Sequence, residues 1–195
     1  MPGHIFDPRH AHRLDEPERL RLLPPDVIVD LLHLTGSETV VDYGAGTGAF
    51  TLPVARALPH GRVVAVDLSQ ELLAKLSEKL DPELAERIEL VHTVTNEIPL
   101  ADAAADVVLG VNVLHEIADQ AKALAEIRRV LKPGGRFVCV DWTANDRPVG
   151  PPRAHMLTLP DARSLLEAVG LEVKEMREPG GRLPYHYVVV GAAPQ

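Results

Sequence analysis

Cysteine, aromatic residues and long apolar runs are all scarce in this chain of 195 residues. Cys139 is the only cysteine, which excludes an internal disulfide and a metal site built from several cysteines. No apolar run approaches the roughly 18 residues that a membrane-spanning helix needs. The polar N-terminal stretch also lacks the apolar centre of a secretory signal. We therefore expect a cytoplasmic protein without a membrane span.

An excess of basic charge is missing as well. The chain has 20 Lys and Arg against 28 Asp and Glu, so its formal net charge is −8. Proteins that bind nucleic acid usually present a basic surface that displaces counterions from the phosphates. The two basic clusters, Arg19 with Arg21 and Arg128 with Arg129, stand among carboxylates and are interpreted as solvated helix faces. Nucleic acid is therefore not expected as a partner.

Strand-like and helical segments alternate along most of the chain. This alternation begins with the short apolar segment ETVVDYG and predicts an α/β fold with a mostly parallel sheet covered by helices on both faces. The last two strand-like segments, at 171–179 and 185–192, are separated by a turn without a helix. We therefore expect these two strands to pair antiparallel at one edge of the sheet.

The densest group of glycines lies in VVDYGAGTGAF, residues 40–50. Gly44, Gly46 and Gly48 follow an apolar run directly, and glycine lets a ligand approach the backbone because it has no Cβ. The loop also satisfies the dinucleotide pattern G-x-G-x-x-G/A. Asp67 ends the next strand, where a carboxylate can accept both hydroxyls of a ribose. The loop alone fits NAD as well as S-adenosylmethionine.

Four further features favour S-adenosylmethionine. Asp42 stands two residues before Gly44, where a fixed carboxylate suits a cationic amino-acid ligand and repels a pyrophosphate. The third glycine of the loop is Gly48, whereas the dinucleotide pattern places its third glycine or alanine at residue 49. The segment LKPGGRF forms a joint between a helix and the fifth strand, and the chain ends with the antiparallel pair.

On these motifs the sequence resembles the class I S-adenosylmethionine-dependent methyltransferases. VVDYGAGTG is similar to their first motif, VVAVDLS to their second, ADVVLGVNVLHEI to their fourth-strand motif, and ALAEIRRVLKPGGRFVCVDW to the segment that follows. The resemblance covers residues 35–192 and is nearest to small enzymes similar to the quinone-biosynthesis methyltransferases. It implies a Rossmann-like sheet of seven strands with an antiparallel last strand, and S-adenosyl-L-methionine as the cofactor.

The same resemblance implies which residues hold the cofactor. Asp42 would support the amino group of the methionine part, directly or through water. Asp67 would bind the ribose hydroxyls and Leu68 would pack on the adenine, while Asn112 would lie near the amino-acid end. The backbone around the methionine part would come from Gly44, Ala45, Gly46 and Gly48.

The third motif departs from the family pattern. Where the family often has an acidic residue that binds the adenine amino group, this chain has Val94 in the segment TVTNEIP. Thr95 or Asn96 is the expected replacement.

His115 and Asp141 are the candidate catalytic residues. Methyl transfer from a sulfonium is an in-line displacement, and a base is needed only where the acceptor atom must lose a proton. His115 follows the fourth strand and could be that base or a histidine that shapes the pocket. Asp141 ends the fifth strand and could hold His115 or accept a substrate hydroxyl. Trp142 is expected as a pocket wall or as core, and Glu116 as a solvated or capping carboxylate.

The first 34 residues are interpreted as an N-terminal lid or cap, and residues 35–195 as the methyltransferase domain. A metal site is not expected, because His4, Asp7 and the nearby histidines have no ligand-like spacing. With so short a cover, we expect a small, largely apolar or aromatic methyl acceptor. The alternatives are a non-catalytic regulatory protein that binds S-adenosylmethionine and, less favoured, an NAD-dependent oxidoreductase. A monomer and a homodimer both fit the sequence.

Overall fold

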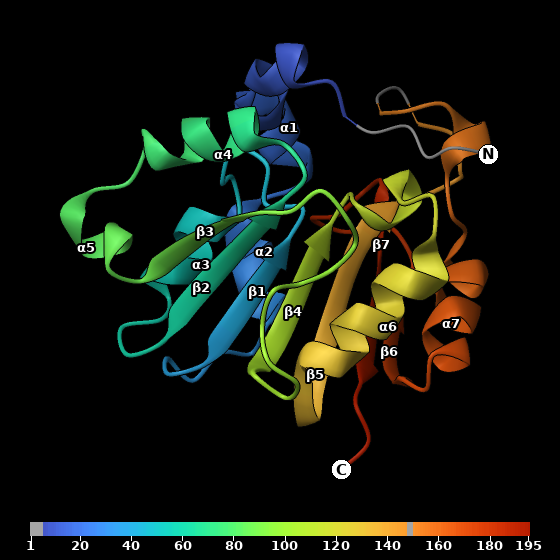
Figure 1. Cartoon of the computed structure of the whole chain (residues 1–195). Helices are drawn as coiled ribbons and strands as arrows, with labels where there is room; N and C mark the ends of the chain where they lie inside the picture. Colours follow the sequence, from blue (N-terminus) through green and yellow to red (C-terminus); the bar gives the residue numbers. More distant parts are fainter. Residues whose placement is uncertain (1–5, 148–149) are drawn as a thin grey trace.

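A seven-stranded sheet runs through the molecule in the computed structural model, which describes residues 6–147 and 150–195 (Figure 1). The strand order is β3-β2-β1-β4-β5-β7-β6. The strands are β1 (Thr39–Tyr43), β2 (Arg62–Asp67), β3 (Ile88–His92), β4 (Ala105–Val111), β5 (Leu131–Trp142), β6 (Glu172–Arg177) and β7 (His186–Ala192). Neighbouring strands from β3 to β5 pair in parallel, and β7 pairs antiparallel with both β5 and β6.

Helices cover both faces of this sheet. The α-helices are α1 (Pro17–Leu22), α2 (Pro25–Leu31), α3 (Thr51–Arg56), α4 (Gln70–Ser77), α5 (Pro82–Ala85), α6 (Gln120–Val130) and α7 (Leu159–Ala168). Three short 3₁₀ helices are η1 (Pro8–Asp15), η2 (Leu114–Glu116) and η3 (Arg153–His155). No helix in the two described ranges is long and apolar enough to cross a membrane.

Period-two alternation divides the strand side chains between two cores. Val40 and Val63 pack into a cluster with residues of α2, α3, α4 and α5. Their neighbours Val41 and Val64 point the other way, into a cluster with residues of α6 and α7. β2 and β4 are central strands that are mostly buried on both faces, and their sequences RVVAVD and ADVVLGV are accordingly rich in Val and Ala.

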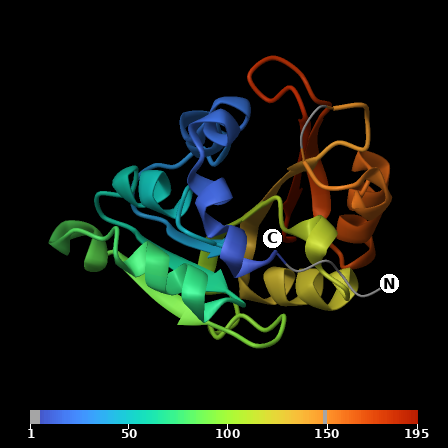
Figure 2. The same ribbon diagram turned by 90° about the horizontal axis from the view of Figure 1, so that it is seen from above.

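The order of the strands places a ligand site at one end of the sheet. After β1 the chain continues to β2 on one side, while β4 pairs with β1 on the other. The loops at the carboxyl ends of β1 and β4 therefore diverge and leave a crevice, which is where open α/β sheets bind ligands. Figure 2 shows this end from above, with the N-terminal helices in blue lying across the central strands.

The predicted fold class is confirmed, and three details differ. The first sixteen residues, expected to be irregular, include η1, and α5 was not expected. The turn expected at Pro133–Gly135 lies inside β5, which begins at Leu131 and pairs with β4 across a register shift. Gly134 adopts a φ of 73° there, so the chain bends without leaving the sheet.

Candidate functional site

The glycine loop after β1 needs glycine for reasons visible in its own packing. Gly44 and Gly48 have φ values of 82° and 85°, which other residues rarely adopt. A Cβ on Gly48 would lie 2.2 Å from Cδ1 of Leu76, and one on Gly44 would lie 2.7 Å from Cγ2 of Val113. The backbone amides of Gly44 and Ala45 both donate to the carbonyl oxygen of Val66, which ties the loop to the end of β2.

The side chain of Asp67 contacts this loop. Its carboxylate accepts the backbone amide of Gly46 at 2.7 Å and that of Ser69 at 2.8 Å. Burial raises the pKa of Asp67, and those backbone hydrogen bonds partly offset the effect. A carboxylate has about four lone-pair sites, so Asp67 can accept two more donors such as the hydroxyls of a ribose. Leu68 follows with 44% of its surface exposed and provides an apolar shelf beside it.

Asp42 is a buried carboxylate that forms no ion pair with a cation among the residues that the structure describes. It is 2% exposed, and its carboxylate accepts the hydroxyl of Thr51 at 2.6 Å. Burial raises its pKa to about 6; the Thr51 hydrogen bond opposes that shift, and the negative charge of Asp67 adds to it. An ammonium group bound beside Asp42 would stabilise its charged form. The chemistry of this position fits the amino group of a methionine moiety.

Asn112 is the second group at this end of the sheet with unused bonding capacity. It follows β4 with a φ of 55°, a left-handed conformation that is uncommon for residues other than glycine. Its side-chain Oδ1 is buried and accepts no hydrogen bond from the described residues. Buried polar atoms are normally paired, so this oxygen fits a donor brought by a ligand. Asp42 and Asn112 together match what the cofactor's cationic amino-acid end requires.

The segment that should bind adenine has Val94 at the position where the family often has an acidic residue. Val94 is 82% exposed. The hydroxyl of Thr95 accepts the amide of Glu97 at 3.2 Å, and the side-chain amide of Asn96 donates to the carbonyl of Asp119 at 3.4 Å. Thr95 thus stabilises its own loop and Asn96 ties that loop to the start of α6, and their predicted role toward the adenine stays a prediction.

His115 and Asp141 form a buried hydrogen-bonded pair at the ends of β4 and β5. Nδ1 of His115 lies 2.6 Å from Oδ1 of Asp141, and the two side chains are 5% and 2% exposed. The carboxylate also accepts the backbone amides of His115 at 3.1 Å and Trp142 at 2.7 Å. These contacts orient the carboxylate toward Nδ1, so Nδ1 carries the proton and Nε2 is available as a base.

The electrostatics of the pair suit proton transfer. Burial acts to lower the pKa of His115, but the charge and hydrogen bond of Asp141 outweigh it and raise the pKa above 6.5. Nε2 lies 3.8 Å from a carboxylate oxygen of Glu116, whose charge acts in the same direction. Glu116 is therefore part of this cluster, and its expected role as a solvated or capping carboxylate is incomplete.

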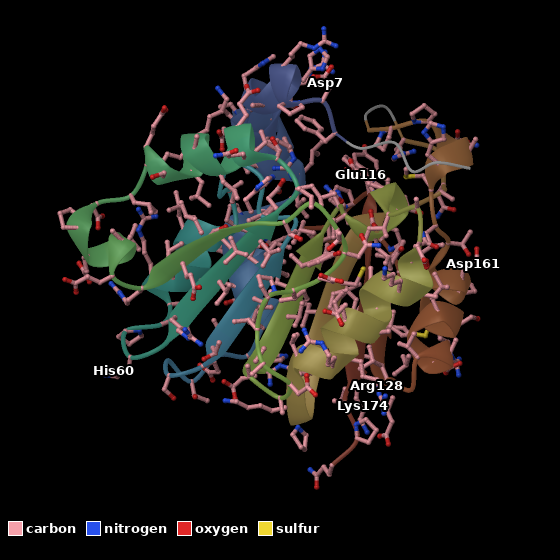
Figure 3. The ribbon with its side chains drawn as sticks, in the orientation of Figure 1. Asp7, His60, Glu116, Arg128, Asp161 and Lys174 are labelled. Atoms are coloured by element: carbon pink, nitrogen blue, oxygen red, sulfur yellow. The ribbon has the colours of Figure 1, made fainter. Side chains whose placement is uncertain are left out.

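The N-terminal segment contacts both halves of this end of the sheet. The backbone amide of Phe6 donates to Glu116 at 3.3 Å. Asp15, at the other end of η1, accepts the hydroxyl of Thr47 at 3.0 Å and Nζ of Lys79 at 2.7 Å. In Figure 3, Asp7 and Glu116 lie at the upper end of the molecule and His60 lies far from them. Residues 6–15 thus lie over the glycine loop and reach the neighbourhood of His115.

Sequence reasoning missed three side chains near the pair. Arg19 of α1, interpreted as part of a solvated face, has its guanidinium 5.4 Å from the Phe50 ring, and burial lowers its pKa to about 10. His186 is 1% exposed and stacks on Trp142 with ring centroids 4.1 Å apart. Arg147 lies 5.2 Å from the Trp142 ring. No sequence pattern marked Arg19 or His186, because their ring partners Phe50 and Trp142 lie far from them in sequence, while the partners of Arg147 are the nearby Trp142 and Pro151.

No cluster of potential metal ligands supports a metal site. Within residues 6–147 and 150–195 there is no group of three or more His, Cys, Asp or Glu residues that could hold a metal ion. His4, one of the N-terminal histidines, lies outside those ranges.

This combination of a seven-stranded sheet, a glycine loop and two carboxylates at β1 and β2 defines the class I S-adenosylmethionine-dependent methyltransferases. The methyltransferase domain family matches residues 41–139, about half of the chain. The chain belongs to this family. The predictions of family and cofactor are confirmed.

Individual relatives agree with this assignment. A demethylmenaquinone methyltransferase of Lactiplantibacillus plantarum is 34% identical over 120 residues, which cover 60% of this chain and 51% of that protein. A UbiE ubiquinone/menaquinone biosynthesis C-methyltransferase of Syntrophotalea carbinolica is 34% identical over 118 residues, 60% of this chain and 49% of that protein. The chain thus spans about half the length of these curated relatives.

Solved structures show the likeness over the whole chain. A SAM-dependent methyltransferase of Aquifex aeolicus superposes with a TM-score of 0.89 at 28% identity, covering 96% of this chain and 99% of that one. The [4+2]-cyclase SpnF superposes with a TM-score of 0.76 at 19% identity, covering 89% and 81%. SpnF shows the shared fold alone, and its name shows that this fold also serves another reaction.

Proposed function

We propose that this protein transfers a methyl group from S-adenosylmethionine to a small acceptor, with His115 as the general base. The observation that carries this proposal is the His115–Asp141 pair, buried at the ends of β4 and β5 and linked by a 2.6 Å contact. A non-catalytic cofactor-binding protein has no need of a buried base oriented by a carboxylate. The pair lies at the same end of the sheet as the glycine loop.

Each residue of the pair has a distinct role in the proposed reaction. The bound cofactor supplies an electrophilic methyl group on its sulfonium. His115 Nε2 takes the proton of the acceptor's O–H or N–H group while the acceptor atom forms its bond to the methyl carbon. Asp141 holds the imidazole in the required tautomer and stabilises the imidazolium that results. The products are the methylated acceptor, S-adenosylhomocysteine and a proton that returns to solvent from His115.

The proposed cofactor contacts follow from the geometry at β1, β2 and β4. Asp42 and Asn112 face the amino-acid end, Asp67 binds the ribose, and Leu68 packs on the adenine. The backbone of Gly44, Ala45, Gly46 and Gly48 surrounds the methionine part. What supports these roles is the uncompensated charge of Asp42, the unpaired oxygen of Asn112 and the orientation of Asp67.

The division into an N-terminal lid, residues 1–34, and a methyltransferase domain, residues 35–195, is part of the same proposal. The contacts of Phe6 with Glu116 and of Asp15 with Thr47 support a lid that closes over both substrates. A lid this short encloses a compact acceptor, and Trp142 offers it an aromatic wall. The names of the quinone-biosynthesis relatives are in keeping with a small-molecule acceptor.

Binding and turnover test the proposal in sequence. Calorimetry should detect S-adenosylhomocysteine binding at sub-millimolar concentration, and Asp67→Ala should abolish it. A pooled metabolite extract with S-adenosylmethionine should then release S-adenosylhomocysteine. Binding of NAD without binding of S-adenosylhomocysteine would instead identify an oxidoreductase. Cofactor binding without turnover on any fraction of the extract would identify a regulatory protein.

A further inference from the structure

Arg147, in the loop after β5, is held in place by its neighbours but has no acidic partner. Its Nη2 donates to the carbonyl oxygen of Pro151 at 2.5 Å, and its guanidinium lies 5.2 Å from the Trp142 ring. Its Nε is buried and donates to no acceptor in the described part of the chain. The residues outside that part, 1–5 and 148–149, include no Asp or Glu.

Among the described residues Arg136 also has a buried, unpaired Nε, and its Nη2 donates to the carbonyl oxygens of Leu32 and His33, whereas two further arginines pair with carboxylates. Arg129 donates to the carboxylates of Glu126 and Asp102, and Arg153 pairs with Asp146 in the same loop as Arg147. Among the described residues no carboxylate forms an ion pair with Arg147. A buried donor on a charged group is costly to leave unpaired. The fixed guanidinium therefore points to an anionic oxygen that a ligand brings.

The surroundings of Arg147 indicate the shape of that ligand. Trp142 is only partly buried, and its ring is tilted by 36° against that of His186. Both ring nitrogens of His186 lack hydrogen-bond partners in the described structure, and burial lowers its pKa to about 3, so the ring is uncharged near neutral pH. The wall beside the guanidinium is therefore planar and neutral, which suits a flat apolar or aromatic group.

Arg147 is also close to the proposed base. The positive charge of Arg147 acts to lower the pKa of His115, and the negative charge of Asp141 acts to raise the pKa of Arg147. A ligand oxygen on the guanidinium would thus place the rest of a small molecule within reach of His115. An arginine presents its donors in a planar fork that matches a carboxylate.

We infer that Arg147 binds a carboxylate of the methyl acceptor, so that the acceptor is a small planar acid held against Trp142. This inference rests on the proposed methyl transfer at His115, and it narrows the acceptor from an apolar or aromatic molecule to one that also carries an anionic group. The carboxylate remains bound to Arg147 during the reaction, and the methyl group goes to the acceptor atom that faces His115.

Trp142 is the only tryptophan of the chain, so its fluorescence reports directly on this site. The protein with bound S-adenosylhomocysteine is titrated with benzoate, phenylacetate and cinnamate, and with the amide of each acid. We expect the acids to change the Trp142 emission in a saturable way and to bind about tenfold or more tightly than their amides, since hydrogen bonds to a charged group are worth that much. Equal affinity of acids and amides, or no response to any acid, would overturn the inference.

Variants separate Arg147 from the general charge of the loop. Arg147→Gln should remove the preference for acids over amides, and Arg147→Lys should retain part of it. Arg153→Gln, which loses only an exposed ion pair in the same loop, is the matched control and should behave like the unchanged protein. A preference for acids that survives in Arg147→Gln would assign the carboxylate to another residue. The comparison of acids with amides in the unchanged protein decides the case if a variant fails to fold.

The methionine part of the cofactor also carries a carboxylate, and a second titration excludes it as the ligand of Arg147. S-adenosylhomocysteine has this carboxylate and 5′-methylthioadenosine lacks it. We expect Arg147→Gln to bind both as the unchanged protein does. A selective loss of affinity for S-adenosylhomocysteine would show that Arg147 serves the cofactor, and would overturn the inference. If the unchanged protein bound no S-adenosylhomocysteine, the proposed function itself would fail.

Discussion

Two carboxylates, Asp42 and Asp141, are equally buried at the same end of the sheet and differ in their partners. Asp141 accepts two backbone amides and pairs with the imidazole of His115. Asp42 accepts the hydroxyl of Thr51, and its pKa is raised to about 6. The first carboxylate is thus complete within the protein, while the second requires a cation. This difference supports the proposed roles of Asp141 as the partner of the base and of Asp42 as a ligand-binding carboxylate.

Asp141→Asn tests the role of the pair in catalysis. An amide would hold the imidazole in the wrong tautomer and would remove the charge that raises its pKa. We expect turnover to fall about 10²- to 10⁴-fold. In the unchanged protein, kcat/KM should rise with pH as His115 loses its proton, with a midpoint above 6.5. In the variant the remaining rate should have a lower midpoint.

Asp102→Asn is the control for this prediction, because Asp102 is an exposed carboxylate paired with Arg129 of α6. Its profile should match that of the unchanged protein. The pair of His115 and Asp141 also makes the stability of the fold depend on pH. Because the pKa of His115 is raised in the folded state, the ion pair stabilises the fold below pH 6.5. This stabilisation is lost as the pH rises through the folded-state pKa. Full turnover and an unshifted profile in Asp141→Asn would contradict the role assigned to the pair.

At the level of single residues, sequence reasoning found those that stand at fixed places in motifs. Asp67 and Asp141 end strands, so the position of each in its motif is enough to place it at the carboxyl edge of the sheet. Arg147 could not be found this way, since its partners come from a proline-rich loop and from Trp142 across the turn. The solvated face expected for Arg19 was wrong for a different reason, since its stacking on Phe50 joins segments that are far apart in sequence.

Among the elements, η1 depends on tertiary contacts for its stability. Its eight residues are mostly polar, only Ala11 is buried, and an isolated helix of this length is not stable in water. Asp15 and Leu14 tie it to the glycine loop, with Cδ1 of Leu14 3.1 Å from the place where a Cβ on Gly46 would lie. A helix held in this way can open by breaking few contacts, as a lid must.

Deleting residues 1–16 tests η1 as a lid. No described residue of this segment belongs to either hydrophobic cluster, so we expect the deletion to lower the melting temperature by only a few degrees, about 2 to 4 °C. Turnover should fall by about tenfold or more, because the acceptor is no longer enclosed. Thermal unfolding and steady-state kinetics measure the two effects.

Arg9→Gln is the matched control for the deletion, since Arg9 pairs only with Asp7 at the surface of η1 and should change neither quantity. Normal turnover by the truncated protein would refute the lid. If the truncated protein failed to fold, the segment would instead be needed for the stability of the fold.

The elements that sequence reasoning predicted correctly are those whose local pattern agrees with their tertiary role. Ser69 caps α4 through a hydrogen bond from Leu72, as expected from its position before an amphipathic segment. The extension of β5 back to Leu131 was missed, because Pro133 and two glycines normally indicate a turn. There the pairing with β4 outweighs the local preference of the segment. Residues 6–15 lack an apolar period, and the local start signal was missed: Asp7 caps η1 by accepting the amide of Arg9, and Pro8 stands at its first position.

For the whole molecule, the fold defines the cofactor more closely than the acceptor. The overall fold is shared with a SAM-dependent methyltransferase and with a cyclase. What distinguishes one member from another lies in the cover and in the segments after β4 and β5. Here those segments supply His115, Asp141, Trp142 and Arg147, so the choice of acceptor depends on these side chains.

The proposed pairing of Asp42 with the cofactor predicts a pH dependence in the stability of the whole molecule. With a folded-state pKa of about 6 against 3.8 for the ordinary group, ionised Asp42 destabilises the ligand-free fold above pH 6, and acidification relieves this effect. The ammonium group of S-adenosylhomocysteine pairs with the ionised form. Affinity should therefore fall about tenfold from about pH 8 to about pH 5, and the ligand-induced rise in melting temperature should shrink by about 3 to 6 °C.

The ligand-induced shift in melting temperature is measured at each pH. This difference removes contributions that the ligand-free and ligand-bound proteins share, including that of His115. Asp42→Asn keeps the hydrogen bond to Thr51 but does not titrate. We expect the ligand-free variant to be more stable than the unchanged protein above pH 6, because the buried charge is gone. Its stabilisation by S-adenosylhomocysteine should be small and independent of pH, since no carboxylate is left to pair with the ammonium group. A pH dependence that persists in Asp42→Asn would place the titrating group elsewhere and remove Asp42 from the cofactor site.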